Sequence, residues 1–147
     1  MPQTDEAQWW FQAVYSAIQQ IPHGQCTSYG HIAALLGYPK RARQVGVCLK
    51  HLPDFDPDEP QMHFFHDENV PWQRVVNAKG GISPRGDGGL GAARQVSKLR
   101  AEGIEVHDGR AGDESWVDLG RWGWFPRHLP GEESGSEGEE QREDNDA

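Results

Sequence analysis

The sequence predicts an α+β fold: a small, mostly helical domain with a winged-helix-like helix-turn-helix and a β-hairpin. Three observations predict it. Apolar residues repeat at helical spacing near the N-terminus, a glycine-containing turn separates two short helical segments, and short β-branched runs follow in the second half. The length of 147 residues suits a single core. We expect one domain over residues 1–130 and a disordered acidic tail over 131–147, which has no apolar anchor.

The first expected helix begins after Thr4 or Asp5 as its cap and ends at a turn formed by IPHG. Its apolar positions are Trp9, Trp10, Val14, Tyr15 and Ile18. A second helix is expected from about Ser28 to Leu36, capped by Thr27 or Ser28 and stopped by Gly37.

A third helix is expected to begin at Pro39, because the first turn of a helix tolerates the missing N–H of proline. Its sequence KRARQVGVCLKHL then places Lys40, Arg41 and Arg43 near the helix start. Two short helices joined by a few residues including a glycine are typical of a helix-turn-helix. Many helical pairs with this pattern bind nothing, so the pattern alone leaves the function open.

The second half contains shorter elements. Residues 54–69 are rich in proline and acids without periodicity and are interpreted as an exposed loop. RVVNAKGGIS predicts a β-hairpin, and PRGDGGLG a glycine-rich loop. ARQVSKLRAEG predicts a last helix that ends at Gly103, followed by strand-like IEVHDG and SWVDL. GRWGWFP is aromatic and is expected to pack back on the body.

The net charge of −9 is unevenly distributed. Of the chain's 23 acids and 14 bases, eight acids and one base lie in 131–147, and six acids and no base lie in 54–68. The remainder holds nine acids and 13 bases, a net charge of +4. These bases cluster at Lys40, Arg41, Arg43, Lys50, Arg74, Lys79 and Arg85. We interpret this as a basic surface with two acidic appendages, which keeps nucleic acid among the possible partners.

Other site classes have weaker support. Cys26 and Cys48 form no disulfide framework or metal-knuckle spacing, and we expect reduced, buried thiols of an intracellular protein. His63, His66 and Asp67 suggest a metal, but a spacing of three on a loop favours solvated surface instead. No apolar run is long enough to span a membrane.

Three features carry a resemblance to a known family: TSYGHIAALLGYPKRARQVG, the PWQRVV segment, and the glycine-containing hairpin expected after it. From about Ala7 to Trp124 the chain resembles the DNA-binding domain of O6-alkylguanine-DNA alkyltransferases. In active members a Pro-Cys-His-Arg box supplies the thiol that accepts the alkyl group, and the histidine helps to deprotonate it. Trp72 stands in place of this cysteine and Gln73 in place of the histidine. This substitution resembles the alkyltransferase-like proteins, which bind the lesion without repairing it.

The chemistry of these two residues agrees with that interpretation. Alkyl transfer needs a thiolate nucleophile and a neighbouring base to activate it. An indole ring cannot perform the displacement, and a glutamine side chain cannot act as a base. The sequence therefore predicts a catalytically inactive relative. Glu102 matches the acid that orients the histidine in active members and is expected to be a structural hydrogen-bonding residue here.

The resemblance also implies roles in recognising a flipped base. Arg43 corresponds to the finger that fills the vacated stack, and Tyr29 to the tyrosine that pushes the flipped nucleotide's phosphate. Trp72, Arg85, Tyr29 and Leu49 are expected to form the lesion pocket. Backbone or minor-groove contacts are expected from Lys40, Arg41, Ala42, Gly46 and Lys50. Leu52 and His51 replace a Gly-Asn pair of active relatives, and the acidic 54–69 loop either points away from the phosphates or weakens binding.

The resulting expectation is a monomer that binds O6-alkylguanine in double-stranded DNA, flips it, and flags it for nucleotide excision repair. Repair proteins are then implied partners, and the protein is expected inside the cell, in the nucleus if the organism is eukaryotic. No metal or organic cofactor is implied. Two alternatives stay open: an active alkyltransferase that uses another cysteine, and a helix-turn-helix binder of undamaged DNA.

Overall fold

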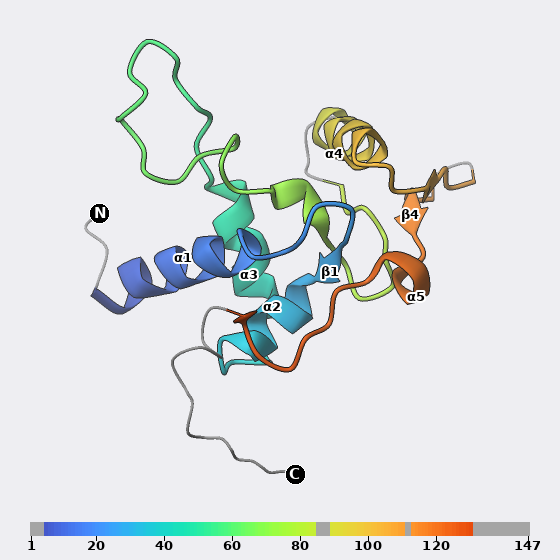
Figure 1. Cartoon of the computed structure of the whole chain (residues 1–147), viewed down its shortest axis with the longest axis horizontal. Coiled ribbons are helices and arrows are strands. Elements are labelled where there is room, and N and C mark those ends of the chain that lie inside the picture. The colour runs from blue at the N-terminus through green and yellow to red at the C-terminus, as the bar shows by residue number, and fades with distance from the viewer. Residues whose placement is uncertain (1–4, 85–88, 111–112, 131–147) are drawn as a thin grey trace.

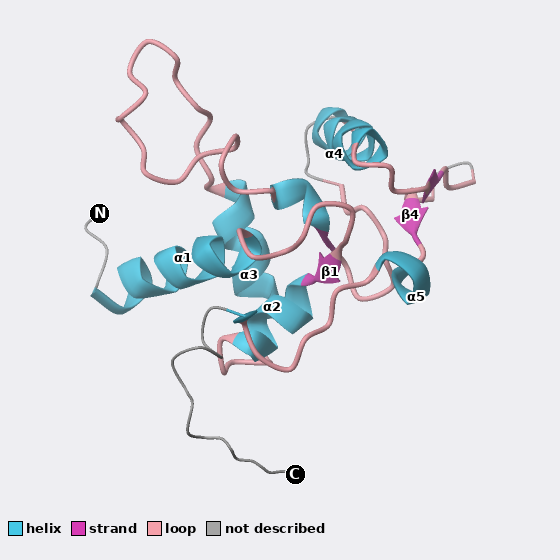
Figure 2. Cartoon of the chain, viewed as in Figure 1, coloured by secondary structure: helices cyan, strands magenta, loops and turns pink. Residues whose placement is uncertain are grey.

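The computed structural model describes residues 5–84, 89–110 and 113–130. Figures 1 and 2 show a mostly helical body with two small β-sheets, which confirms the predicted α+β class. Four predictions lie outside the described residues: the cap at Thr4, Arg85 as a pocket residue, part of the glycine-rich loop, and the disordered tail over 131–147. Within the described part, no helix is both long and apolar enough to cross a bilayer.

The first three helices match the predicted order. Helix α1 spans Asp5–Ile18, α2 spans Tyr29–Leu35, and α3 spans Ala42–Lys50. Ser28 caps α2, since its hydroxyl accepts a hydrogen bond of 3.0 Å from the His31 N–H, as predicted. After α2 the chain turns at Gly37, whose φ of +91° is accessible mainly to glycine. The helix-turn-helix is therefore confirmed as a structural unit.

The start of α3 differs from the prediction. The helix begins at Ala42 rather than Pro39, and residues 38–41 form a turn closed by a 2.9 Å bond from Arg41 N–H to Tyr38 C=O. Lys40 and Arg41 therefore precede the helix. Proline is favourable both in the first turn of a helix and in an ordinary turn, so Pro39 could not locate the start of α3.

Two short strands tie α2 to the segment that contains Trp72. Strand β1, Thr27–Ser28, pairs in parallel with β2, Val75–Val76, which follows the 3₁₀ helix η1, Trp72–Arg74. The predicted hairpin over RVVNAKGGIS is wrong, because β2 pairs with β1 and Gly81 bridges to Trp116. The local pattern of valines and glycines specifies strand and turn but not the pairing partner. This parallel pairing places the start of α2 beside η1.

The remaining elements form the other end of the molecule. Helix α4 spans Leu90–Ala101, three residues earlier at its start than predicted, and the chain leaves it at Gly103 with a φ of +89°. Strands β3, Val106–His107, and β4, Trp116–Val117, pair antiparallel, so both predicted strand segments are confirmed. Helix α5, Leu119–Trp122, is followed by the aromatic segment, which packs back through Trp124 and a bridge between Cys26 and Gly123.

Two buried clusters stabilise these two ends. The larger joins α1, α2 and α3 to Val70, Trp72, Val75 and Leu129. The second joins Cys26, Val76 and Ile82 to Leu99 of α4, Ile104 and the β3–β4 pair. Neighbouring valines of β2 thus point into different clusters, as expected for a strand, whose side chains alternate between its two faces. The segment after Trp72 therefore links the two ends.

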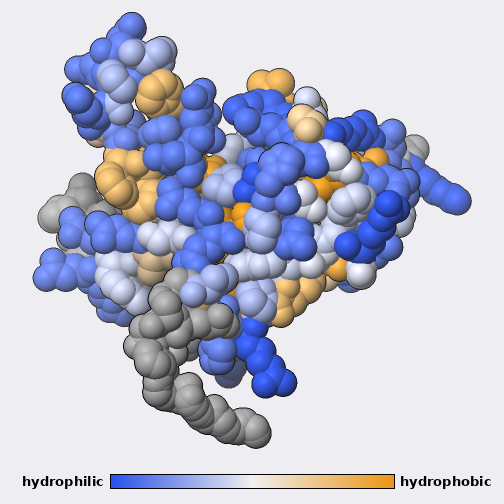
Figure 3. Space-filling view, in the orientation of Figure 1, coloured by the Kyte–Doolittle hydropathy of each residue, from blue (hydrophilic) through white to orange (hydrophobic). Residues whose placement is uncertain are grey.

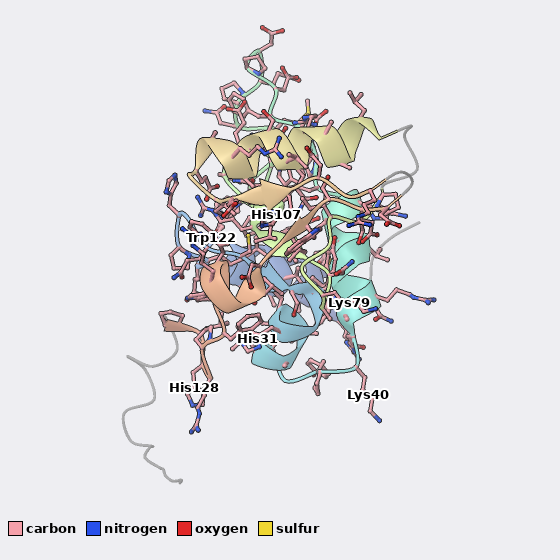
Figure 4. The ribbon with its side chains drawn as sticks, turned by 90° about the vertical axis from the view of Figure 1, so that its right-hand side faces the viewer. His31, Lys40, Lys79, His107, Trp122 and His128 are labelled. Atoms are coloured by element: carbon pink, nitrogen blue, oxygen red, sulfur yellow. The ribbon has the colours of Figure 1, made fainter. Side chains whose placement is uncertain are left out.

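The acidic loop over 54–69 contains no helix or strand, as predicted, and projects from the body (Figure 1). Its base is closed by hydrogen bonds, and Phe65 anchors it on Tyr15 with ring centroids 5.3 Å apart. Figure 3 shows this lobe as largely hydrophilic with a few hydrophobic side chains on its surface. In Figure 4 the loop rises above α4, whereas α3 lies at the right edge. The loop therefore does not cover the exposed face of α3.

Candidate nucleic-acid interface

One face of α3 is left exposed by the helical packing. Val45, Cys48 and Leu49 are buried against α1 and α2, while Arg43 and Lys50 are exposed at the opposite side. Tyr15 fixes the helix from below, because its hydroxyl donates a 2.6 Å hydrogen bond to the Cys48 carbonyl. Burial and the neighbouring Cys48 raise the pKa of that hydroxyl, which keeps it protonated as the donor.

The exposed face of α3 borders a hollow of about 370 Å³. Its lining comprises Tyr29, Ala42, Arg43, Gly46, Val47, Lys50, Ser83 and Pro84. A Cβ built on Gly46 would lie 4.0 Å from the Tyr29 ring, an ordinary contact, so packing does not require glycine there. Tyr29, Arg43, Gly46 and Lys50, predicted as site residues from sequence, are thus brought together. The side chains of Arg43 and Lys50 form no hydrogen bond or ion pair with any described residue.

Lys40 and Arg41, although adjacent, have different surroundings. Lys40 is exposed and extends from the turn that precedes α3 (Figure 4). The Arg41 guanidinium instead lies over the Tyr38 ring at 4.3 Å and the Trp10 ring at 5.3 Å, with Glu6 at 3.9 Å. These cation–π contacts fasten the turn to α1. Arg41 therefore packs on the body through these rings while 37% of its side chain stays exposed, and its predicted contact with DNA stays a prediction.

Trp72 forms a wall of a second hollow of about 250 Å³ beside the first. The indole is only 6% exposed, and Leu49, Leu52, Gly91 and Arg94 also line the hollow. Lys50 lines both hollows, so they adjoin at the end of α3. Of the predicted lesion-pocket residues, Trp72 and Leu49 meet here and Tyr29 lies in the first hollow. Arg85, predicted as the fourth, lies outside the described residues, directly after Pro84.

Two residues of α4 that support this hollow were missed from sequence. The Arg94 guanidinium lies 5.5 Å from the centre of the Trp72 ring and 3.6 Å from the Asp67 carboxylate. The buried Gln95 amide donates to the carbonyls of Gln73 at 3.1 Å and Val75 at 2.9 Å, which anchors the middle of η1 and the residue that follows it. No local pattern marks either residue, because their roles depend on how α4 crosses η1.

The residues that follow Trp72 form a buried polar network around Glu102. Its carboxylate accepts hydrogen bonds from the Gln73 amide at 2.6 Å, from Arg74 at 3.0 Å and from the Gly24 N–H at 2.8 Å. Burial alone would raise the pKa of Glu102, but these bonds and the Arg74 charge outweigh it and lower the pKa. The predicted structural role of Glu102 is confirmed. Arg74, counted among surface bases from sequence, is instead 15% exposed.

Neither cysteine is placed for nucleophilic chemistry. Cys26 and Cys48 are 0% and 1% exposed, and each belongs to a hydrophobic cluster. Burial raises the pKa of both thiols to about 12, helped at Cys26 by the Glu102 charge. The thiolate fraction at neutral pH is then of order 10⁻⁵, and neither side chain lines the two hollows. The predicted burial of both residues is confirmed.

The histidines and acids of the loop are used locally. Asp67 accepts from the Phe55 N–H at 2.9 Å, and the His66 ring accepts from the Glu68 N–H at 3.2 Å. Among residues 5–84, 89–110 and 113–130, no three His, Cys, Asp or Glu side chains are grouped as a metal site would need.

A family model now relates this geometry to known proteins. The model for the DNA-binding domain of 6-O-methylguanine DNA methyltransferase matches residues 9–104, which include most of α1, all of α2, α3 and α4, and both hollows. The chain belongs to this family.

Its relatives include an alkyltransferase-like protein and DNA base-flipping proteins. The chain is 39% identical to Alkyltransferase-like protein 1 of Schizosaccharomyces pombe over 113 residues, 77% of this chain and 92% of that protein. It is 40% identical to the DNA base-flipping protein of Vibrio parahaemolyticus over 95 residues, 65% of this chain and 80% of that protein. A crystal structure of S. pombe Atl1 with damaged DNA containing O6-carboxymethylguanine matches with a TM-score of 0.65 and 37% identity. That match covers 85% of this chain and all of the other.

The predicted kinship with alkyltransferase-like proteins is therefore confirmed. In this alkyltransferase-family chain the resemblance assigns Trp72 and Gln73 to the positions of the reactive cysteine and its base. The structure places an indole at the hollow and engages the glutamine with Glu102. The chain is a relative of the alkyltransferases that lacks their nucleophile, and its Gln73 belongs to the Glu102 network.

Proposed function

We propose that this protein binds duplex DNA through the exposed face of α3, turns an O6-alkylguanine out of the helix, and holds it beside Trp72 without removing the alkyl group. The observation that carries the proposal is the position of Trp72. It forms the wall of a hollow that opens next to an exposed basic helix face, and no thiol reaches that hollow.

Arg43 and Tyr29 are suited to the flipping step. Arg43 has no partner among the described residues, so no existing interaction must break before its side chain enters the stack. An alkylated guanine pairs poorly, which lowers the cost of turning it out. Tyr29 lines the first hollow beside Gly46 of α3, where its ring can press on the phosphate of the displaced nucleotide. Leu49 and Trp72 supply apolar walls for the flipped base in the second hollow.

Affinity without sequence preference comes from the cations around α3. Lys40 and Lys50 are exposed and can neutralise phosphates, while Ala42 and Gly46 leave the helix backbone close to the surface. Arg41 is assigned to the fold because its guanidinium packs on Tyr38 and Trp10.

The fate of the lesion depends on the absence of alkyl transfer. Because the alkyl group stays on the base, a bound complex can only mark the damage for another system. We propose that this system is nucleotide excision repair and that the protein acts as a monomer. In a eukaryotic cell we propose that it acts in the nucleus, where the genome lies.

A titration combined with mass spectrometry tests this proposal. The protein is titrated with duplexes that contain guanine or O6-methylguanine at one position, at a single salt concentration. We expect tighter binding of the methylated duplex, a methyl group that stays on the DNA, and an unchanged protein mass. An active alkyltransferase of the family serves as the positive control for methyl transfer.

Each alternative gives a different result in the same experiment. A protein mass increased by one methyl group at Cys26 or Cys48 would establish an alkyltransferase with a displaced cysteine. Equal affinity for both duplexes would establish a binder of undamaged DNA, for which the hollow at Trp72 has no use.

A further inference from the structure

The acidic loop contributes to the wall of the hollow at Trp72. Asp54 and Asp67, at the two ends of the loop, both line that hollow, together with Lys50, Trp72 and Arg94. Although the loop projects from the body in Figure 1, its base is part of the proposed lesion pocket. The loop's charge is therefore present at the position that a flipped base would occupy.

Asp54 is held in place by its neighbours on both sides. The backbone N–H of Asp67 donates to the Pro53 carbonyl at 2.9 Å, and the Asp67 carboxylate accepts from the Phe55 N–H at 2.9 Å. The Phe55 ring also packs on His66 with centroids 4.7 Å apart. Since the residues before and after Asp54 are both fastened to the far end of the loop, the Asp54 carboxylate stays at the rim of the hollow.

The charges that line the hollow are not all equally available. The Arg94 guanidinium has Asp67 at 3.6 Å, so these two charges largely compensate each other. Lys50 also lines the first hollow on the α3 face, where bound phosphates would compensate its charge. No described residue forms an ion pair with Asp54. One carboxylate is left without a partner at the rim.

We propose that Asp54 makes the lesion pocket charge-selective, so that it disfavours anionic O6 substituents relative to neutral substituents of the same shape. This inference rests on the proposed function, because it concerns the same pocket. Two negative charges close together repel, and because Asp54 is exposed, solvent weakens this repulsion without removing it. Asp54 is then a specificity-determining residue contributed by the acidic loop.

The test compares two adducts that differ only in charge. Duplexes carry O6-carboxymethylguanine or its neutral isostere O6-carbamoylmethylguanine, and a third carries guanine. The measured quantity is the ratio of the dissociation constants for the carboxymethyl and carbamoylmethyl duplexes. For the unmodified protein we expect a ratio of about two to five, the size of a partly exposed charge interaction. Asp54→Asn should bring the ratio towards one.

Asp58→Asn is the matched control. It removes one charge from the same loop, but Asp58 is exposed and does not line the hollow. If the loop only repels phosphates, both variants will tighten all three duplexes equally and leave the ratio unchanged, which overturns the proposal. Thermal unfolding of both variants verifies that the loop base is intact. Asp67→Asn is unsuitable, because Asp67 also holds Phe55 and Arg94.

The same titrations distinguish a loss of charge selectivity from a loss of lesion binding. Lesion duplexes that bind tighter than undamaged DNA with a ratio of one would overturn charge selectivity alone. Lesion duplexes that bind no tighter than undamaged DNA would overturn both.

Discussion

Arg43 and Arg74 bear the same charge in opposite surroundings. Arg43 is exposed on α3 and has no partner among the described residues. Arg74 is 15% exposed and bonds to the Glu102 carboxylate at 3.0 Å and to the Ile21 carbonyl at 2.7 Å. Both lie in motifs that resemble the alkyltransferases, and sequence alone placed both on one basic surface.

The difference shows which cations are available to a ligand. Withdrawing Arg74 would leave the Glu102 charge buried without its main partner, so Arg74 is committed to the fold. Arg43 loses only water when it meets DNA. The Glu102 network joins Gln73 and Arg74 of η1 to the end of α4, so it holds these two elements together. The following variants test that separation, from the largest expected effect to the smallest.

Arg74→Ala should reduce the free energy of unfolding by about 3–5 kcal/mol, because it strands a buried carboxylate. Arg74→Lys keeps the charge but loses the forked hydrogen bonds and should have a smaller effect. Urea unfolding measures both. Lesion binding by the fraction that stays folded should equal that of the unmodified protein, and selective loss of binding by folded Arg74→Lys would contradict the separation.

The same network predicts a dependence of stability on pH. The pKa of Glu102 is lowered in the folded state from its ordinary value of 4.5. Its contribution should therefore be fully present above that value and be lost as the pH falls through the folded-state pKa. Glu102→Gln should reduce stability at neutral pH and flatten the acid limb of a plot of unfolding free energy against pH. An acid limb identical to that of the unmodified protein would show that other carboxylates dominate.

Arg43→Ala should weaken binding to an O6-methylguanine duplex by roughly 2 kcal/mol, the size typical of an interfacial arginine that dominates binding. The unfolding free energy should be unchanged. Fluorescence of a base analogue opposite the lesion reports flipping and should be lost. Arg121→Ala is the matched control, since Arg121 is exposed but lies on α5 with Glu105 and Trp122. Normal flipping by Arg43→Ala would refute the finger assignment.

Lys50→Ala should have the smallest effect, about 1 kcal/mol, and should weaken damaged and undamaged duplexes alike. A phosphate contact also contributes about one to the slope of log affinity against log salt. Titrations at several salt concentrations measure that slope. An effect confined to the lesion duplex would instead show that Lys50 contacts the flipped base. Lys50 can reach that position because it lines both hollows.

Sequence patterns predicted the parts of the fold that local interactions decide. The helical spacing in α1, the Ser28 cap and the turn at Gly37 each depend on residues a few positions apart, and all three are confirmed. The hairpin after Trp72 failed for the opposite reason. Two valines and a glycine turn encode a strand and a reversal, but β1, nearly 50 residues earlier, competes successfully for β2.

The candidate site shows the same distinction between what local sequence predicts and what distant contacts decide. The motifs around Arg43 and Trp72 identified the family and the missing thiol, because these residue types bear directly on the chemistry. Other features of the site depend on contacts between distant segments. These are the burial of Arg74, the packing of Arg41 on Tyr38, and the positions of Asp54 and Arg94 in the lining of the hollow. A sequence gives the charge of each side chain, but only the packing of the folded chain decides which charged side chains reach solvent.

By itself the sequence determined that this protein has a helix-turn-helix and cannot perform alkyl transfer at residue 72, since a residue type sets its own chemistry and its local conformation. Tertiary structure decided which of its cations face outward and that the acidic loop borders the Trp72 hollow. The physical reason is that solvent exposure and proximity arise only when helices and strands pack, and here the pairing of β1 with β2 and the crossing of α4 over η1 set them.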